Sequence, residues 1–202
     1  MEKEIRVYDV AFELRNATEN NPTTLRGLAI PYNKMSEDMG FREVIASGAC
    51  QRALSKTPDL LALYEHDYSN LLARSSNETL KVVETEKGLE VEIELPLTTL
   101  GKDLAILTQR GTLSKMSFGF STGFESTEWT TMDDGTDLRT INHIDNLYEV
   151  SIVSTPAYTD TEVAKRCLGE CKTKKDLDNK VHDTELAKMK STIADFKNKI
   201  AN

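Results

Sequence analysis

The segment from Leu80 to Pro96 constrains the fold of this chain more than any other. After a turn at 86–88, apolar and acidic residues alternate up to the proline: Leu89, Glu90, Val91, Glu92, Ile93, Glu94 and Leu95. Period-two alternation places the apolar side chains on one face of a strand and the carboxylates on the other. The segment therefore predicts an antiparallel hairpin in a sheet that has one buried and one solvated face.

Short β-rich runs continue along the first 160 residues. We expect strands within 4–14, 23–33, 58–66, 114–124, 125–131, 137–145 and 148–153. Helices are few: a short one entered from the loop at 43–54, and one capped by Thr98 or Thr99 with Gly111 just past its end. This pattern predicts a mainly β protein with helices (α+β), built as a closed or nearly closed β-barrel of about seven strands with peripheral helices.

The composition changes after residue 164, which predicts a barrel domain at 1–164 and a charged helical tail at 165–202. The tail holds ten basic and six acidic residues, net +4, whereas the other 164 residues carry 15 basic and 27 acidic, net −12. Apolar residues in the tail recur at steps of three and four: Leu186, Met189, Ile193, Phe196 and Ile200. Such a seam of about two heptads fits a coiled coil, and equally a helix that packs back onto its own barrel.

Composition also excludes several classes of partner. The acidic body offers no basic surface for nucleic acid, and no apolar stretch approaches the roughly 20 residues that cross a bilayer. The chain has an odd number of cysteines, Cys50, Cys167 and Cys171, and we expect no signal peptide. The pair in the tail, with His182 nearby, does not fit the ligand spacing of a zinc site. We therefore expect a reduced, cytosolic protein without a cofactor, which binds neither nucleic acid nor a membrane.

Three residues of the body carry chemistry: His66 at the end of an apolar run, Ser117 in KMSFGFSTGF, and Glu149 in NLYEVSIVSTPAY. An imidazole, a hydroxyl and a carboxylate are the parts of an acyl-transfer site. His66 and Ser117 also have ordinary explanations, as a surface histidine and a small residue on a buried strand. Glu149 needs a partner, because an unpaired carboxylate in an apolar run is costly. The order histidine, serine, glutamate matches no common triad, so spacing alone leaves the trio open between a site and a coincidence.

Six short motifs follow one another with consistent spacing. They are GLAIPY (27–32), EVIASGA (43–49), LALYEHD (61–67), KGLEVEIELP (87–96), GTLSKMSFGF (111–120) and LYEVSIVSTPAY (147–158). Together they resemble the prohead protease family of tailed bacteriophages, serine peptidases related in fold to the herpesvirus assembly proteases. The resemblance covers about 27–164 of the chain and implies a herpesvirus-protease-like barrel.

The resemblance implies a role for each member of the trio. The family's histidine falls on His66, its nucleophilic serine on Ser117, and its acid on Glu149. Three residues are weaker candidates for the third role: His143, since the herpesvirus relatives use a second histidine there, and the acids Asp67 and Asp145. Backbone N–H groups near the glycines of the serine segment, or in the loop at 154–155, are candidates for binding the oxyanion.

The resemblance also implies a substrate and a place. It predicts a serine endopeptidase that cleaves the scaffold, or the scaffold-like N-terminal segment of the major capsid protein, and itself. The reaction would take place inside the assembling prohead in the host cytoplasm, with a homodimer and docking of the tail on a helical scaffold as further expectations. The alternative is a catalytically inactive scaffold or assembly protein of the capsid. An esterase or amidase on an unrelated fold is disfavoured, because no G-x-S-x-G motif surrounds Ser117.

Overall fold

The computed structural model describes residues 2–16, 22–56 and 59–154, and four isolated positions at 164, 168, 169 and 189. By compactness the chain divides into two units, residues 1–161 and 162–202. Almost all of the second unit lies outside the described residues. Most of the tail predicted at 165–202 falls there, with its two cysteines and all of its apolar seam except Met189, so the division at residue 164 stays a prediction.

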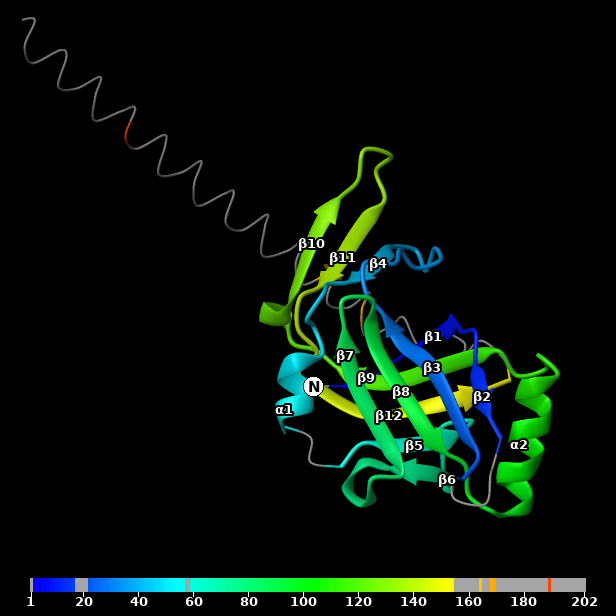
Figure 1. Ribbon diagram of the computed structural model, residues 1–202. Helices are drawn as coiled ribbons and strands as arrows, with labels where there is room; N and C mark the ends of the chain where they lie inside the picture. Colours follow the sequence, from blue (N-terminus) through cyan, green and yellow to red (C-terminus); the bar gives the residue numbers. More distant parts are fainter. Residues whose placement is uncertain are drawn as a thin grey trace, which may run out of the picture. The chain divides into compact units, whose positions relative to one another are not determined.

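The described residues form twelve strands, two α-helices and two short 3-10 helices (Figure 1). The strands are β1 (Glu4–Asp9), β2 (Glu13–Arg15), β3 (Thr24–Pro31), β4 (Arg42–Ile45), β5 (Leu61–Tyr64), β6 (Asp67–Arg74), β7 (Leu80–Thr85), β8 (Gly88–Glu94), β9 (Lys115–Ser121), β10 (Thr127–Thr131), β11 (Asp137–Ile141) and β12 (Asn146–Val153). The helices are η1 (Ser75–Asn77), η2 (Phe124–Ser126), α1 (Gln51–Lys56) and α2 (Thr99–Gln109). The run at 4–14 divides into β1 and β2, and β4 and β6 are strands that the sequence pattern did not predict, β4 lying where a loop was expected.

Helix α2 begins where its capping residue predicts. The side chain of Thr98 accepts a hydrogen bond from the N–H of Gly101 at 3.3 Å, which satisfies one of the free donors of the first turn. Gly111 follows the helix with a φ of 71°, a conformation that glycine adopts without strain. In the part of the chain that the structure describes, no helix has the length and apolar character to cross a membrane.

A five-stranded sheet, in the order β1-β9-β12-β5-β6, lies at the centre of the fold. Strand β9 is antiparallel to both β1 and β12, whereas β12 runs parallel to β5. Figure 1 shows β9, β12 and β5 running side by side. Alternate residues of the two central strands enter the hydrophobic core: Met116, Phe118 and Phe120 from β9, and Val150 and Ile152 from β12.

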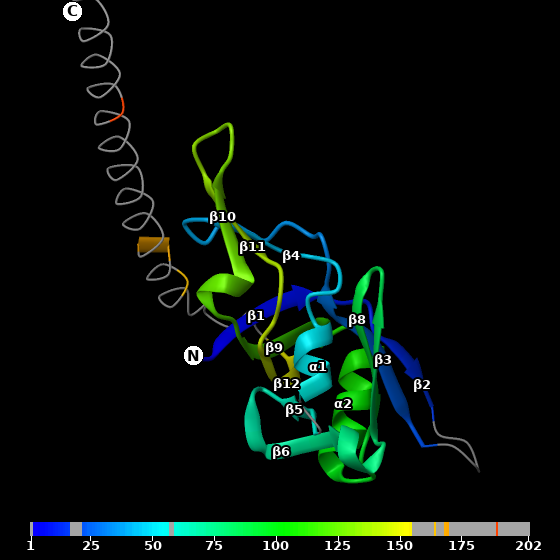
Figure 2. The same ribbon diagram turned by 90° about the vertical axis from the view of Figure 1, so that its left-hand side faces the viewer.

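Two further sheets pack around this one: a four-stranded sheet in the order β2-β3-β8-β7 and a three-stranded sheet in the order β10-β11-β4. Strand β3 contacts β9 and β6 contacts β8, so the four-stranded sheet packs on the five-stranded one. One hydrophobic cluster takes residues from both sheets. In Figure 2 the β10–β11 hairpin extends away from these two larger sheets.

The mainly β character with few helices is confirmed, but the expected closed barrel is wrong. The described strands lie in three separate sheets, and no backbone ladder joins one sheet to the next. The physical reason is that alternation reports one buried face for each strand, and the strands of two packed sheets have this face just as those of a barrel do. Closure depends on which edges pair, which alternation does not encode.

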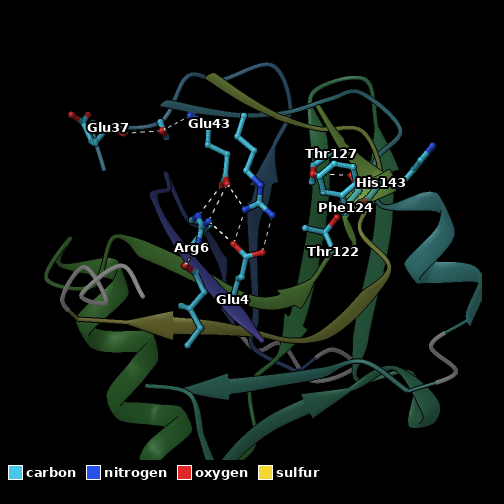
Figure 3. Close-up of polar contacts among 11 residues, drawn as sticks. Glu4, Arg6, Glu37, Glu43, Thr122, Phe124, Thr127 and His143 are labelled. Carbon is cyan, nitrogen blue, oxygen red and sulfur yellow. Dashed lines mark hydrogen bonds and ion pairs between the residues drawn. The ribbon is translucent and has the colours of Figure 1, made fainter. Parts of the chain in front are cut away.

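Side chains, rather than a backbone ladder, join β1 to the three-stranded sheet. Four buried residues form this junction, the ionic quartet: Glu4 and Arg6 on β1, Glu43 on β4 and Arg139 on β11. Arg6 donates to Glu43 at 2.7 and 2.9 Å and to Glu4 at 2.8 Å, while Arg139 donates to Glu4 at 2.7 and 3.0 Å and to Glu43 at 3.0 Å. Figure 3 shows the two carboxylates converging on the guanidinium of Arg6.

Candidate active site

The adjacent strands β9 and β12 carry most of the polar residues of the site. Their register places Ser117 opposite Ser151 and Gly119 opposite Glu149. Because side chains alternate along a strand, these four positions share one face of the sheet, the face opposite to that of Phe118 in the core. Ser117, Ser151 and Glu149 are all fully buried. We call this the catalytic face.

An irregularity in β12 decides on which face Glu149 lies. Tyr148 has no partner in β9, because the register shifts between Leu147 and Glu149. In an unbroken register Glu149 would stand opposite Phe118 and project into the hydrophobic core. A shift of one residue moves a side chain to the other face, and bulges beside active sites commonly re-aim a residue in this way. The bulge therefore brings Glu149 to the face of Ser117.

His66 lies in the two-residue turn between β5 and β6. The φ angles of Glu65 and His66 are 55° and 58°. Two successive positive φ values are typical of type I′ hairpin turns, which favour asparagine and glycine, and larger residues there carry strain of about 1–3 kcal/mol each. The end of β12 holds the turn: the N–H of Glu65 donates to Ile152 O at 3.0 Å, and its Oε1 accepts from the N–H of Ser154 at 2.7 Å. The predicted strand at 58–66 thus ends earlier, and the turn presents His66.

The turn and the bulge bring His66 and Glu149 together. Nδ1 of His66 lies 2.9 Å from Oε1 of Glu149, and the same oxygen lies 3.0 Å from Nζ of Lys3. The other oxygen, Oε2, accepts a hydrogen bond from Oγ of Ser151 at 2.6 Å. The carboxylate in the apolar run, which needed a partner, therefore has three.

These partners keep Glu149 ionised and thereby set the proton positions on His66. Burial alone would raise the pKa of Glu149, but hydrogen bonds from His66 and Ser151 and the nearby charge of Lys3 hold it below its ordinary value of 4.5. An ionised carboxylate only accepts hydrogen bonds, so Nδ1 of His66 must be the donor. In the neutral imidazole, Nε2 then carries the free lone pair, as a general base requires.

The hydroxyl of Ser117 and the imidazole of His66 are not hydrogen-bonded to each other. Oγ of Ser117 donates instead to the backbone carbonyl oxygen of Arg6, at 2.9 Å. Nε2 of His66 is buried and has no hydrogen-bond partner among the described residues. Catalytic hydrogen bonds are often absent until substrate binds. The candidate donor, the hydroxyl of Ser117, and the candidate acceptor, Nε2 of His66, are both present in this site.

The two weaker acid candidates are engaged elsewhere. Oxygens of Asp145 accept hydrogen bonds from Arg52 Nη1 at 2.9 Å, the N–H of Gly123 at 2.7 Å and Oγ of Ser126 at 2.9 Å. Asp67 is exposed, and its Oδ1 accepts from the hydroxyl of Ser69 at 2.6 Å. Both carboxylates stabilise local loops.

The His143 side chain is exposed, and the ring points away from the Glu4–Arg6–Glu43 cluster in Figure 3. Its hydrogen bonds run through the backbone: its N–H donates to Ser126 O at 3.1 Å, and its carbonyl oxygen accepts from Oγ1 of Thr122 at 2.9 Å. Of the four candidates for the third role, Glu149 is the one in hydrogen-bond contact with His66 within the described residues.

Two of the suggested oxyanion donors already have acceptors. The N–H of Gly123 donates to Asp145 and that of Ser154 donates to Glu65. Thr155 lies outside the described residues, and the oxyanion donors stay a prediction. Across 2–16, 22–56 and 59–154, no group of three or more histidine, cysteine or acidic side chains could hold a metal ion.

The sequence motifs did not identify Ser151 or Lys3 as site residues, and they pointed to the glycines of the serine segment, Gly119 among them, only as a region of oxyanion donors. Ser151 follows Glu149 by two residues on one strand, so alternation along β12 alone would have placed the two side chains together. Gly119 leaves room for the site: a Cβ at this position would overlap Oε1 of Glu149 and the side chain of Lys3. No local signal identifies Lys3, because its place depends on the pairing of β1 with β9.

Comparisons with known proteins identify the family and the fold. The chain matches the family described as caudovirus prohead serine protease over residues 10–175. Among solved structures it is similar to the capsid assembly protease gp21 of bacteriophage T4, with a TM-score of 0.51 and 11% sequence identity. The match covers 77% of this chain and 98% of that one, and it shows a similarity of fold. No curated protein matches the chain. Since the family match spans most of its length, the chain belongs to the caudovirus prohead serine proteases.

Proposed function

We propose that this serine protease is a prohead maturation endopeptidase in which Ser117 is the nucleophile, His66 the general base and acid, and Glu149 the group that orients the imidazole. Its proposed substrates are the scaffold, or the scaffold-like N-terminal segment of the major capsid protein, and the chain itself. Its proposed place of action is the interior of the assembling capsid.

The hydrogen bond between His66 and Glu149 carries the proposal. It joins residues 83 positions apart at 2.9 Å and uses Nδ1 of the imidazole, which leaves Nε2 without a partner. The partnerless Nε2 is then free to accept a proton, and Ser117 is a buried hydroxyl on the same face as Glu149. A buried Nε2 without a hydrogen-bond partner contributes nothing to the stability of the fold, whereas a general base needs a nitrogen that is free to accept a proton.

The first chemical step begins with a rotation of Ser117. Its hydroxyl leaves the carbonyl oxygen of Arg6 and donates to Nε2 of His66, which then takes the proton as Oγ attacks the scissile carbonyl carbon. Glu149 stabilises the imidazolium that forms. The imidazolium gives its proton to the leaving amine, the peptide C–N bond breaks, and a water molecule activated by His66 hydrolyses the acyl-enzyme.

The proposal is tested by expressing the full chain with its matching major capsid protein and following the masses of both proteins over time. The wild-type chain is expected to shorten the capsid protein and itself. Ser117→Ala is expected to leave both intact, because the hydroxyl of Ser151, directly opposite Ser117, already donates to Glu149.

Ser126→Ala is the matched control. Ser126 is also a buried serine, but it donates to Asp145, away from the catalytic face. This variant should cleave like the wild type. Cleavage that persists in Ser117→Ala would refute the nucleophile assignment, and an intact capsid protein beside an active wild type would refute the substrate.

A further inference from the structure

One buried hydroxyl of the catalytic face has no part in the steps above. Oγ of Ser151 donates to Oε2 of Glu149 at 2.6 Å, and both residues are fully buried. The direction of this bond is determined by chemistry, since an ionised carboxylate has no proton to give. Water does not reach Ser151, so the bond has no solvent competitor.

We propose that Ser151 is a positioning residue for catalysis: it holds Oε2 of Glu149, and this keeps Oε1 turned toward Nδ1 of His66. The inference rests on the proposed function, because it takes Glu149 as the orienting acid. It extends the relay by one member, in the order Ser117, His66, Glu149, Ser151.

The surroundings of the carboxylate explain why it needs such a support. Gly119, directly opposite Glu149, has no side chain to confine the carboxylate from that strand. Oε1 is shared between His66 and the partly exposed Lys3, at 2.9 and 3.0 Å. A carboxylate held only at Oε1 would be free to turn toward the lysine cation. A donor on Oε2 removes that freedom, as supporting hydrogen bonds do in preorganised sites.

Ser151 also stands directly opposite Ser117 in the β9–β12 register, which makes it a possible nucleophile by position. Its hydrogen bond argues against that role. The proton of Ser151 is held by Glu149, whereas the proton of Ser117 lies on a neutral backbone carbonyl from which rotation releases it easily. The two serines therefore have different roles, and a nucleophile-directed reagent distinguishes them.

The test uses a fluorophosphonate, which reports activation of the nucleophile without knowledge of the peptide substrate. In the reaction Oγ bonds to phosphorus, fluoride leaves, and the hydroxyl proton passes to Nε2 of His66. The full-length wild type should be labelled at Ser117. Ser151→Ala should be labelled at the same residue roughly 10-fold to 100-fold more slowly, as expected for the loss of a hydrogen bond to a charged group.

The pH dependence separates positioning from a merely structural role. Loss of the Ser151 donor raises the pKa of Glu149, so the acid limb that protonation of this carboxylate produces in the labelling rate should move to higher pH. General loosening of the sheet would lower the rate at every pH and leave the limb in place. Ser151→Thr, which keeps a hydroxyl, should restore the limb, and Ser126→Ala, which removes a serine donor from Asp145, should match the wild type.

The outcomes separate the role of Ser151 from the proposed function. If folded Ser151→Ala is labelled at the wild-type rate with the acid limb at the wild-type pH, this inference is overturned. Labelling at Ser117 in that variant still supports the proposed function. Labelling at Ser151, or none that depends on Ser117, overturns both. If Ser151→Ala does not fold, Ser151→Cys fills the space with a much weaker donor. It should show the same upward shift of the limb, and a wild-type profile there overturns the inference.

Discussion

The ionic quartet and the catalytic face are both buried clusters of charge, and the N-terminal segment contributes to each, through Glu4 and Arg6 of β1 and through Lys3 just before it. In the quartet two arginines face two glutamates, and each of the four carboxylate oxygens accepts at least one hydrogen bond. On the catalytic face one glutamate meets an imidazole, a hydroxyl and a lysine that is 33% exposed. All carboxylate oxygens of the first cluster are paired, although Nε of Arg139 has no partner, whereas the second cluster keeps an unused acceptor at Nε2 of His66.

The difference shows what a buried charge is for in each place. Burial disfavours the charge of Arg6, yet the adjacent Glu43 and Glu4 raise its pKa above the usual range, so the quartet keeps this charge near neutral pH. It serves as a fixed clamp between sheets that share no backbone ladder. The second cluster instead keeps an imidazole nitrogen without a partner, which is what a general base requires. Three variants test this contrast.

The largest effect is expected for Glu149→Gln on the catalytic face. The amide cannot stabilise the imidazolium and favours the wrong tautomer, so labelling by the fluorophosphonate should slow by about 10⁴-fold. Urea unfolding should change little, because the residue supports chemistry rather than a junction. His143→Gln is the control and should react like the wild type. The reverse result, a slow His143→Gln beside an active Glu149→Gln, would move the third role to His143.

The next effect is expected for Arg139→Met in the quartet. It leaves two buried carboxylates with one arginine, and breaking a buried ion network from one side costs about 3–5 kcal/mol. Urea unfolding measures the loss. Arg26→Met, at the exposed pair with Glu90, is the control and should alter the unfolding free energy far less. An equally small change in Arg139→Met would mean that the quartet is no clamp.

The pH dependence of unfolding is a second test of the quartet. Burial would raise the pKa of Glu4, but Arg139 and Arg6 bring it below its ordinary value of 4.5. A carboxyl whose folded pKa is depressed stabilises the fold above its unfolded value, and this contribution is lost as pH falls through the folded one. The wild type should therefore lose stability below about pH 4.5, and Arg139→Met should lose less over the same range.

The smallest effect is expected for Lys3→Met. Its ammonium ion pairs with Glu149 at 3.0 Å but remains partly solvated, and such pairs contribute less than about 1 kcal/mol. The labelling rate should stay within about fivefold of the wild type. The acid limb should move slightly to higher pH, because a positive charge near Glu149 is lost. A large loss of activity would place Lys3 in the catalytic machinery.

Much of the local structure follows from the sequence. The hairpin of β7 and β8, the cap at Thr98 and the final strand through Glu149 lie where alternation, capping and turn residues indicate. The need of Glu149 for a partner was also predictable, because an unpaired acid in an apolar run is costly, but spacing alone did not join it to His66 and Ser117. These features are predictable because they depend on neighbours in the chain, whose spacing the sequence states directly.

What only the tertiary structure decided is how distant strands meet. The bulge at Tyr148 turns Glu149 from the core to the catalytic face, and pairing of β1 with β9 brings Lys3 to the same carboxylate. The three separate sheets replace the expected barrel for the same reason. Register and edge pairing depend on the packing energy of the whole core, and a slip of one residue turns every side chain of a strand to the other face. The sequence therefore determined which residues the candidate site contains, and the assembled sheets determined their geometry.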